Sequence, residues 1–351
     1  MEEKNLYLME KAPVKEGLLK LGIPTIVGML MIGFYNFVDS YFVAQLGTHP
    51  MGAMSVSFPL MTLMPGIGLL IGNGASALIS ELLGAKEKEK AEIVLSSSFL
   101  YLIFFSLASL LFYPFLDKLM VFLGASEAVL PYALDYGRIL VISFVFHIPS
   151  VAMTNLVRAE GATRLSAVSQ VVGSLINIIL DPILIFQFNM GIKGAAIATA
   201  IAQFVSFCIL LNYYLSGKSY LKIHLKKAEF QSWVIKPILY VGLPLFAVNL
   251  FQSISMSLSN VLAAAHSDEV LAAMGIVSRL ITMVTLGITG FSRGYQTYAS
   301  YHYGADNLDR VEDSTQMAYR WTMIASVIIT GVMILLRKPL LSAFSEDQSV
   351  L

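Results

Sequence analysis

Two carboxylates lie inside long apolar stretches of the sequence, where an unpaired charge is costly. They are Asp39 and Asp181, and a charged side chain at the centre of a bilayer costs about 2.5 to 3.5 kcal/mol on insertion scales. Asn36 and Ser40 share a helical face with Asp39, and Asn177 precedes Asp181 by one helical turn. Acids with such oxygen-bearing neighbours indicate a proton or alkali-cation site. The alternative is a structural role, in which hydrogen bonds to hydroxyls and amides fix the packing of the helices.

A stripe of polar side chains leads to Asp181 along one helical face. Gln170, Ser174 and Asn177 precede it at helical spacing, and such a stripe must face protein or water. Neighbouring apolar stretches add Thr199, Gln203 and Tyr136. We therefore predict a cavity beside the two acids, with Asn36, Gln170, Ser174 and Gln203 in its wall. A sodium ion at the acids is the only metal expected, because carboxylate, amide and carbonyl oxygens suit hard cations.

Other chemistries find little support in the sequence. No nucleophile stands beside a base, and the histidines lack metal-ligand spacing, so neither an enzyme nor a cofactor is expected. The glycine-rich run from Pro65 to Gly74 resembles a phosphate-binding loop only superficially, and close helix packing explains it better. The 23 basic and 23 acidic side chains give zero net charge, so a nucleic-acid partner is not expected.

The elements that must position these residues are membrane-spanning helices. Of the 351 residues, 56% are hydrophobic and 13% are charged, whereas about a quarter are charged in ordinary soluble domains. The apolar residues fall in blocks of about 20, the length that crosses a bilayer as a helix. We predict an all-α integral membrane protein with about nine spans, near residues 18–46, 53–80, 94–116, 131–156, 165–188, 194–215, 234–263, 270–298 and 317–336.

Basic residues alternate between the connecting segments and so predict the orientation. They cluster after the second, fourth and sixth spans, as Lys86, Lys88 and Lys90, then Arg158 and Arg164, then Lys218, Lys222, Lys226 and Lys227. Lys and Arg are retained on the cytoplasmic side, so the N-terminus of this multi-pass protein is predicted to be cytoplasmic. The first and fifth spans then run outward, which places Asp39 and Asp181 at similar depth in the outer half.

The chain aligns with itself when it is shifted by 220 residues. Small residues and prolines keep this register over about 70 positions: Gly22, Pro24, Gly74, Gly84 and Ala85 meet Gly242, Pro244, Gly294, Gly304 and Ala305. We infer an internal duplication of a six-helix lobe, related by an axis along the membrane normal. The predicted parts are a complete lobe (1–216), a basic cytoplasmic linker (217–232) and a partial lobe of about three helices (233–351). The second copy stops before its fourth span, which predicts a truncated twelve-helix protein. The alternative is that the missing helices are dispensable or come from elsewhere.

Several of these residues resemble the multidrug and toxic compound extrusion (MATE) family in its bacterial branch. The resemblance rests on Asn36, Val38, Asp39 and Gly47, the turn from Arg158 to Thr163, Asn177 with Asp181 and Pro182, and the segment 290–305. It implies twelve spans in two lobes of a monomer in the bacterial cytoplasmic membrane, in contact with lipid. It also implies export of small amphipathic, cationic compounds in exchange for protons or sodium ions. The family's coupling site would fall on Asp39, Asn177, Asp181 and Thr199, with Tyr136 nearby.

Three functions remain open at this point. The first is a cation-coupled antiporter that works by alternating access. The second is a flippase of lipid-linked precursors with the same architecture, which would need a cationic central cavity, and Arg279 and Arg293 offer limited support for one. The third is a membrane-embedded enzyme or a scaffold, and a scaffold would tolerate neutral residues in place of both acids.

Overall fold

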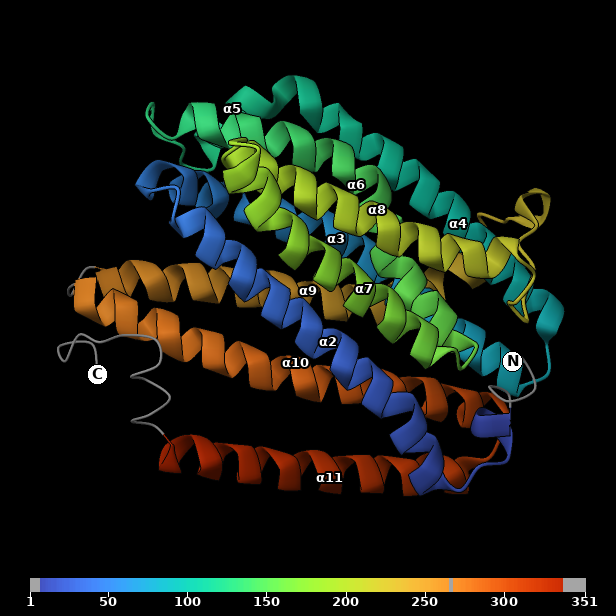
Figure 1. Ribbon diagram of the computed structural model, residues 1–351. Coiled ribbons are helices and arrows are strands. Elements are labelled where there is room, and N and C mark those ends of the chain that lie inside the picture. Colours follow the sequence, from blue (N-terminus) through green and yellow to red (C-terminus); the bar gives the residue numbers. More distant parts are fainter. Residues whose placement is uncertain (1–6, 265–267, 337–351) are drawn as a thin grey trace.

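The computed structural model describes residues 7–264 and 268–336 and, between residues 253 and 280, mostly the backbone alone. Helices are the only regular secondary structure in that part of the chain, which contains no strand (Figure 1). The long helices are α2 (Val14–Ala44), α3 (Thr48–Gly84), α4 (Lys88–Ser109), α6 (Leu130–Ala159), α7 (Thr163–Pro182), α8 (Ile192–Leu215), α9 (Ser232–Ala264), α10 (Asp268–Gly304) and α11 (Leu308–Leu335). Short helical segments are η1 (Leu110–Phe115), α5 (Leu116–Phe122), η2 (Ile183–Gln187) and η3 (Leu225–Lys227).

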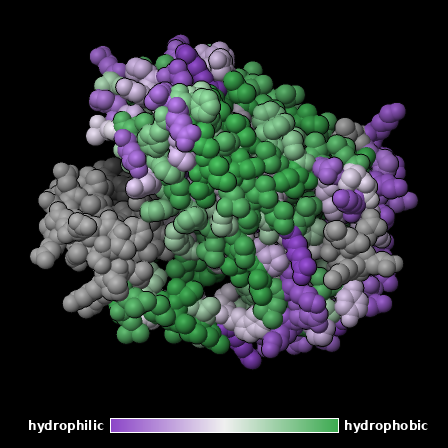
Figure 2. All heavy atoms as spheres, viewed as in Figure 1, coloured by the Kyte–Doolittle hydropathy of each residue, from purple (hydrophilic) through white to green (hydrophobic). Residues whose placement is uncertain are grey.

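Eight of the described helices are long and apolar enough to cross a membrane. Hydrophobic side chains cover the middle of the face shown in Figure 2, and hydrophilic ones gather toward its edges. The eighth predicted span, 270–298, corresponds to α10, whose described part is not among these eight. The fold is therefore a polytopic helical membrane protein, as the sequence predicted.

The bundle has two ends, and the connecting turns distinguish them. We call "basic end" the end with the turns Ala85–Glu87, Glu160–Ala162 and Ala305–Asn307 and the segment 216–231. The opposite end carries the turns 45–47 and 188–191. Figure 1 shows the first turns of α2 at the basic end. This is the alternation that the lysines and arginines predicted.

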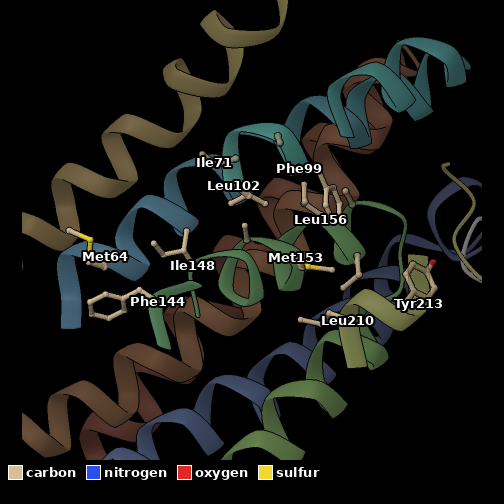
Figure 3. Close-up of a cluster of buried hydrophobic side chains, with 14 of the residues drawn as sticks. Met64, Ile71, Phe99, Leu102, Phe144, Ile148, Met153, Leu156, Leu210 and Tyr213 are labelled. Atoms are coloured by element: carbon tan, nitrogen blue, oxygen red, sulfur yellow. The ribbon is translucent and has the colours of Figure 1, made fainter. Parts of the chain in front are cut away.

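The first six spans form one lobe around a hydrophobic core. Within it α3 packs on α4 and α6, α6 and α7 pack on α8, and α2 packs on α7. Figure 3 shows part of the core, where Ile71, Leu102, Ile148 and Leu156 from α3, α4 and α6 point toward one another. Each of these four side chains is at most 3% exposed. Because this hydrophobic core stabilises the lobe, polar residues on the faces of the helices that point away from the core can line a cavity.

Glycines let α3 approach its neighbours closely, as the sequence predicted. A Cβ atom on Gly68 would lie 2.4 Å from the Ile148 carbonyl oxygen of α6, and one on Gly74 would lie 2.1 Å from the Ile238 carbonyl oxygen of α9. Small residues at such crossings bring backbones into van der Waals contact, which drives helix association where lipid offers no hydrophobic gain. The glycine run is thus a packing surface.

The second lobe begins with α9, α10 and α11. All three contact the first lobe: α9 lies along α3, α10 lies along α2 and α3, and α11 contacts α2. The sequence repeat reappears in their contacts. A Cβ on Gly84 would lie 1.8 Å from the carbonyl oxygen of Tyr301, and one on Gly304 would lie 1.8 Å from that of Glu81. The residues of these two contacts exchange places under the 220-residue shift, as expected for lobes related by a pseudo-two-fold axis.

The turns that follow these glycines repeat as well. Lys86 after α3 and Asp306 after α10 occupy the left-handed region, with φ of 61° and 56°. Both belong to the same position of the aligned sequence, and non-glycine residues rarely adopt this conformation. The repeat therefore extends to the backbone conformation of corresponding turns.

Candidate functional site

A cavity of about 350 Å³ lies between the two lobes. Helices α2, α6, α7 and α8 supply most of one wall, and α9 and α10 supply the other. Polar residues predicted from the sequence line it: Gln170, Ser174, Asn177, Thr199 and Gln203. For these residues the predicted polar stripe and the observed cavity wall agree.

The two acids lie together near the opposite end of the bundle. Asp39 is five residues from the end of α2, and Asp181 is next to the last residue of α7. Asp39 is 2% exposed and Asp181 is fully buried. Their carboxyl groups lie within hydrogen-bonding reach of each other, so two residues 142 positions apart in the sequence form one site. We call Asp39 and Asp181 the acid pair.

Asn177 and Thr199 connect the acid pair to the cavity wall. The Asn177 amide donates to Asp181 Oδ1 at 3.4 Å and to Thr199 Oγ1 at 3.2 Å. Tyr136 is fully buried and close enough to interact electrostatically with both acids, and its hydroxyl lies 3.5 Å from Met61 Sδ. The structure thus brings together all five residues that the resemblance assigned to coupling.

Several oxygen atoms at this site have no hydrogen-bond partner in the part of the chain that the structure describes. They are Asp39 Oδ1, Asp181 Oδ2, Asn177 Oδ1 and the hydroxyl oxygen of Ser174. A buried oxygen without a donor costs about 1 to 3 kcal/mol, and more when it is charged. A proton or a cation among these oxygens would remove that cost. Within the described residues, no cluster of three His, Cys, Asp or Glu side chains could hold a metal ion.

Proline shapes the helix that carries Asp181. Pro182 has no N–H to donate to the previous turn, so α7 ends there and continues as the π-helical segment η2. Pro182 thus places a break in regular helical hydrogen bonding directly after the acid.

One predicted cavity residue does not line the cavity. Asn36 is exposed, and its backbone carbonyl accepts a hydrogen bond from Ser40 at 2.8 Å. Asp39 lies between the faces of Tyr35 and Asn36, and the way α2 packs on α7 turns Tyr35 inward. The Tyr35 hydroxyl lies within hydrogen-bonding reach of Gln203. Tyr35 therefore replaces Asn36 in the site.

Other residues line the cavity as well. Of these, the sequence analysis had connected only Arg293 with a central cavity, as support for the flippase. Thr282, Thr285, Thr289 and Arg293 of α10 line one wall, and Arg158 and His147 of α6 line the facing part. The α10 residues recur every three or four positions, so their helical spacing was a usable signal. Arg279, which the sequence analysis gave as support for the flippase hypothesis, lies outside the residues whose side chains are described.

A buried carboxylate outside the acid pair anchors the basic end. Glu160 follows α6 and is 5% exposed. It accepts hydrogen bonds from the Ser219 hydroxyl at 2.8 Å, the Tyr213 hydroxyl at 3.2 Å and the Tyr220 amide at 2.8 Å. The predicted linker is thereby fastened to the first lobe. Burial raises the pKa of Glu160 from 4.5 to about 7 even though these donors favour the carboxylate.

The raised pKa of Glu160 predicts a pH dependence of stability. Between pH 4.5 and 7 the folded protein binds the proton more tightly than the unfolded chain does, so the unfolding free energy falls as pH rises. The full effect is on the order of 3 kcal/mol. Glu160→Gln should remove this part of the slope when thermal unfolding in detergent is followed from pH 5 to 8. Glu127→Gln, at an exposed position, should keep the wild-type slope, and an unchanged slope in Glu160→Gln would contradict the assignment.

Fold and site together define a polytopic helical membrane protein with a polar cavity between two repeated lobes. Comparison with known proteins narrows this class. The MatE family model matches residues 24–183 and 244–351, and the chain belongs to this family of transport proteins. The multidrug export protein MepA of Staphylococcus aureus (strain NCTC 8325 / PS 47) is 28% identical over 352 residues, which cover 100% of this chain and 78% of that protein.

Solved structures share the fold. A crystal structure of MATE in complex with MaL6 matches with a TM-score of 0.94 at 24% sequence identity, covering 99% of this chain and 78% of that chain. The outward-facing conformation of a multidrug resistance MATE family transporter of the MOP superfamily gives the same TM-score, identity and coverage. At this identity the likeness establishes the architecture alone.

Proposed function

We propose that the protein exports small amphipathic, cationic organic compounds in exchange for protons or sodium ions. One observation carries the proposal: the acid pair is buried beside the cavity, and oxygens around it have no hydrogen-bond partner. The coupling ion is the only cofactor in the proposal. The protein would work as a monomer in the bacterial cytoplasmic membrane, with its basic end in the cytoplasm.

Alternating access gives the acid pair its part in the exchange. Two carboxylates in contact at low dielectric repel each other when both are charged, so an ion that neutralises one of them stabilises the arrangement of helices around the pair. A cationic compound in the cavity benefits from the opposite charge state. The two ligands would thus favour different states, and each would weaken the binding of the other.

The comparisons support export of drugs over flipping of lipid-linked precursors. Relatives that align along the whole of this chain are described as multidrug export proteins. The acid pair also favours a cationic substrate at that end of the cavity. The flippase is therefore not retained as a second proposal.

Transport of a fluorescent cation across vesicles tests this function. Purified protein in liposomes should move ethidium against a proton or a sodium gradient, and dissipating that gradient should stop the movement. A protonophore dissipates only the proton gradient, and a sodium ionophore only the sodium gradient, so the pair of treatments identifies the ion. Ethidium movement that ignores both gradients would contradict coupled exchange.

A further inference from the structure

The cavity contains a second charged feature, far from the acid pair. Arg158 of α6 and Arg293 of α10 both line it toward the basic end. Arg158 is 2% exposed, Arg293 is partly buried, and Arg158 lies close enough to Arg293 for the two positive charges to interact. Two arginines thus face one another across the boundary between the lobes.

Neither guanidinium has an acidic partner among the described residues. The ion pairs found there involve Lys20, Lys90, Arg138 and Lys193 instead. Arg158 donates to Asn155 Oδ1 and, at 3.3 Å, to the Ser166 hydroxyl oxygen, and Arg293 donates to Asn73 Oδ1. These acceptors are neutral, and a buried charge without an opposite charge costs several kcal/mol. The site therefore holds uncompensated positive charge.

Hydrogen-bond donors exceed acceptors here. Each guanidinium offers about five N–H donors, and three neutral oxygens accept from the two groups. Asn73 is 1% exposed, and its amide nitrogen has no acceptor among the residues that the structure describes. Two positive charges and an unused amide donor match the several lone pairs of a phosphate or carboxylate group, which arginine binds in bidentate fashion.

The repeat places this cluster between the two lobes. Asn73 and Arg293 are 220 positions apart, so they occupy the same position in the two copies and meet on the pseudo-two-fold axis. Arg158 reaches them from α6: its partner Asn155 has its amide nitrogen 3.1 Å from where a Cβ on Gly72 would lie. A group bound here would contact both lobes at once.

We propose that Arg158, Arg293 and Asn73 form a binding site for an oxyanion, a phosphate or carboxylate group, at the basic end of the cavity. The oxyanion is either a free inorganic ion or the acidic head group of an amphipathic molecule. The cavity is then polarised, with the acid pair at one end and an anion site at the other. Binding requires no ion gradient, so this proposal stands or falls separately from coupled exchange.

Calorimetric titration of the purified chain in a neutral detergent tests the site. We expect 1-naphthyl phosphate to bind once per chain, and Arg158→Gln or Arg293→Gln to weaken binding by at least about ten-fold, because each removes a charge-assisted contact. Arg293→Lys keeps the charge and should recover part of the affinity. Arg138→Gln is a matched control, since Arg138 is 51% exposed, and it should bind as the wild type does.

A gain-of-charge variant separates the anion site from a purely structural role. Asn73→Asp puts a carboxylate beside Arg293, which should raise the thermal stability of the anion-free protein and abolish binding of 1-naphthyl phosphate. Equal affinity for 1-naphthyl phosphate in wild type and in a folded Arg158→Gln/Arg293→Gln double variant would overturn the proposal. So would equal binding of 1-naphthol, which has no anionic group.

Two further titrations identify the source of the oxyanion. Inorganic phosphate that binds as tightly as 1-naphthyl phosphate points to a free ion, and much weaker binding points to an organic head group. Loss of 1-naphthyl phosphate binding in phosphatidylglycerol nanodiscs, but not in phosphatidylcholine nanodiscs, points to a lipid head group. Each result supports an oxyanion site, whereas absence of binding by every phosphate probe would refute it.

Discussion

Asp39→Asn and Asp181→Asn are each expected to reduce gradient-driven ethidium transport by about 100-fold, to the level of empty vesicles. Asparagine keeps the shape of aspartate but can neither release a proton nor offer a charge to sodium. The acid pair then has one fixed neutral member, so loading and unloading of the ion no longer changes its charge. A coupling free energy of about 1 to 3 kcal/mol corresponds to about 5- to 150-fold in affinity, which sets the scale of the loss.

The same variants make a second measurement informative. Ethidium affinity of the wild type should change with pH or with sodium concentration, because coupling is reciprocal, and in both variants this dependence should vanish. Asp117→Asn is the control, since Asp117 is 69% exposed and 4.0 Å from Arg138. Full transport with unchanged ion dependence in Asp39→Asn and Asp181→Asn would reduce the acid pair to a structural role.

Gly84→Val and Gly304→Val are expected to hold the lobes apart at the basic end. Each added Cβ would lie 1.8 Å from a carbonyl oxygen of the other lobe, a distance that only movement of the backbone can relieve. Overpacking of this kind costs about 1 to 3 kcal/mol or more. The closed arrangement should lose about ten-fold or more of its population, and transport should fall in proportion because the cycle requires both states.

Accessibility of the cavity distinguishes this effect from unfolding. A cysteine introduced by Ser150→Cys in a Cys208→Ser background lines the cavity, and inside-out vesicles expose the cytoplasmic face to an impermeant maleimide. Both glycine variants should label faster than the parent. Gly331→Val should label and transport as the parent does, because no atom of the described residues lies within 4 Å of its added Cβ. Unchanged labelling rates in Gly84→Val and Gly304→Val would contradict the prediction, because they would show that closure at the basic end does not depend on this contact.

The acid pair and the polar stripe could be predicted because a charge inside an apolar run is unfavourable unless it has a polar partner or faces a cavity. The outward orientation of the Asn36 side chain could not be predicted. Asp39 sits between Tyr35 and Asn36 on the helix, and only the packing of α2 on α7 decides which of the two faces inward. Helical spacing shows that either Tyr35 or Asn36 can face the site beside Asp39, and the tertiary contacts of α2 determine that it is Tyr35.

The arginine cluster shows a different limit of sequence reasoning. Arg158 belongs to a basic turn, and basic turns usually face water, yet α6 extends to Ala159 and carries Arg158 into the interior. The repeat was detectable from small residues in register, but its consequence for Asn73 and Arg293 was not, since the two residues differ in type. The 220-residue shift makes the two positions equivalent, but only the structure shows that their side chains are in contact.

The contact between the C-terminal ends of α3 and α10 has a consequence for the energetics of the transport cycle. At Gly84 and Gly304 the two lobes meet through main-chain atoms, and glycine has no rotamers to lose when the surfaces come together. Closing this joint therefore costs little conformational entropy, and opening it strands no interlocked side chains. Because closing and opening this contact changes the free energy little, the ligand in the cavity determines whether the open or the closed state is more populated.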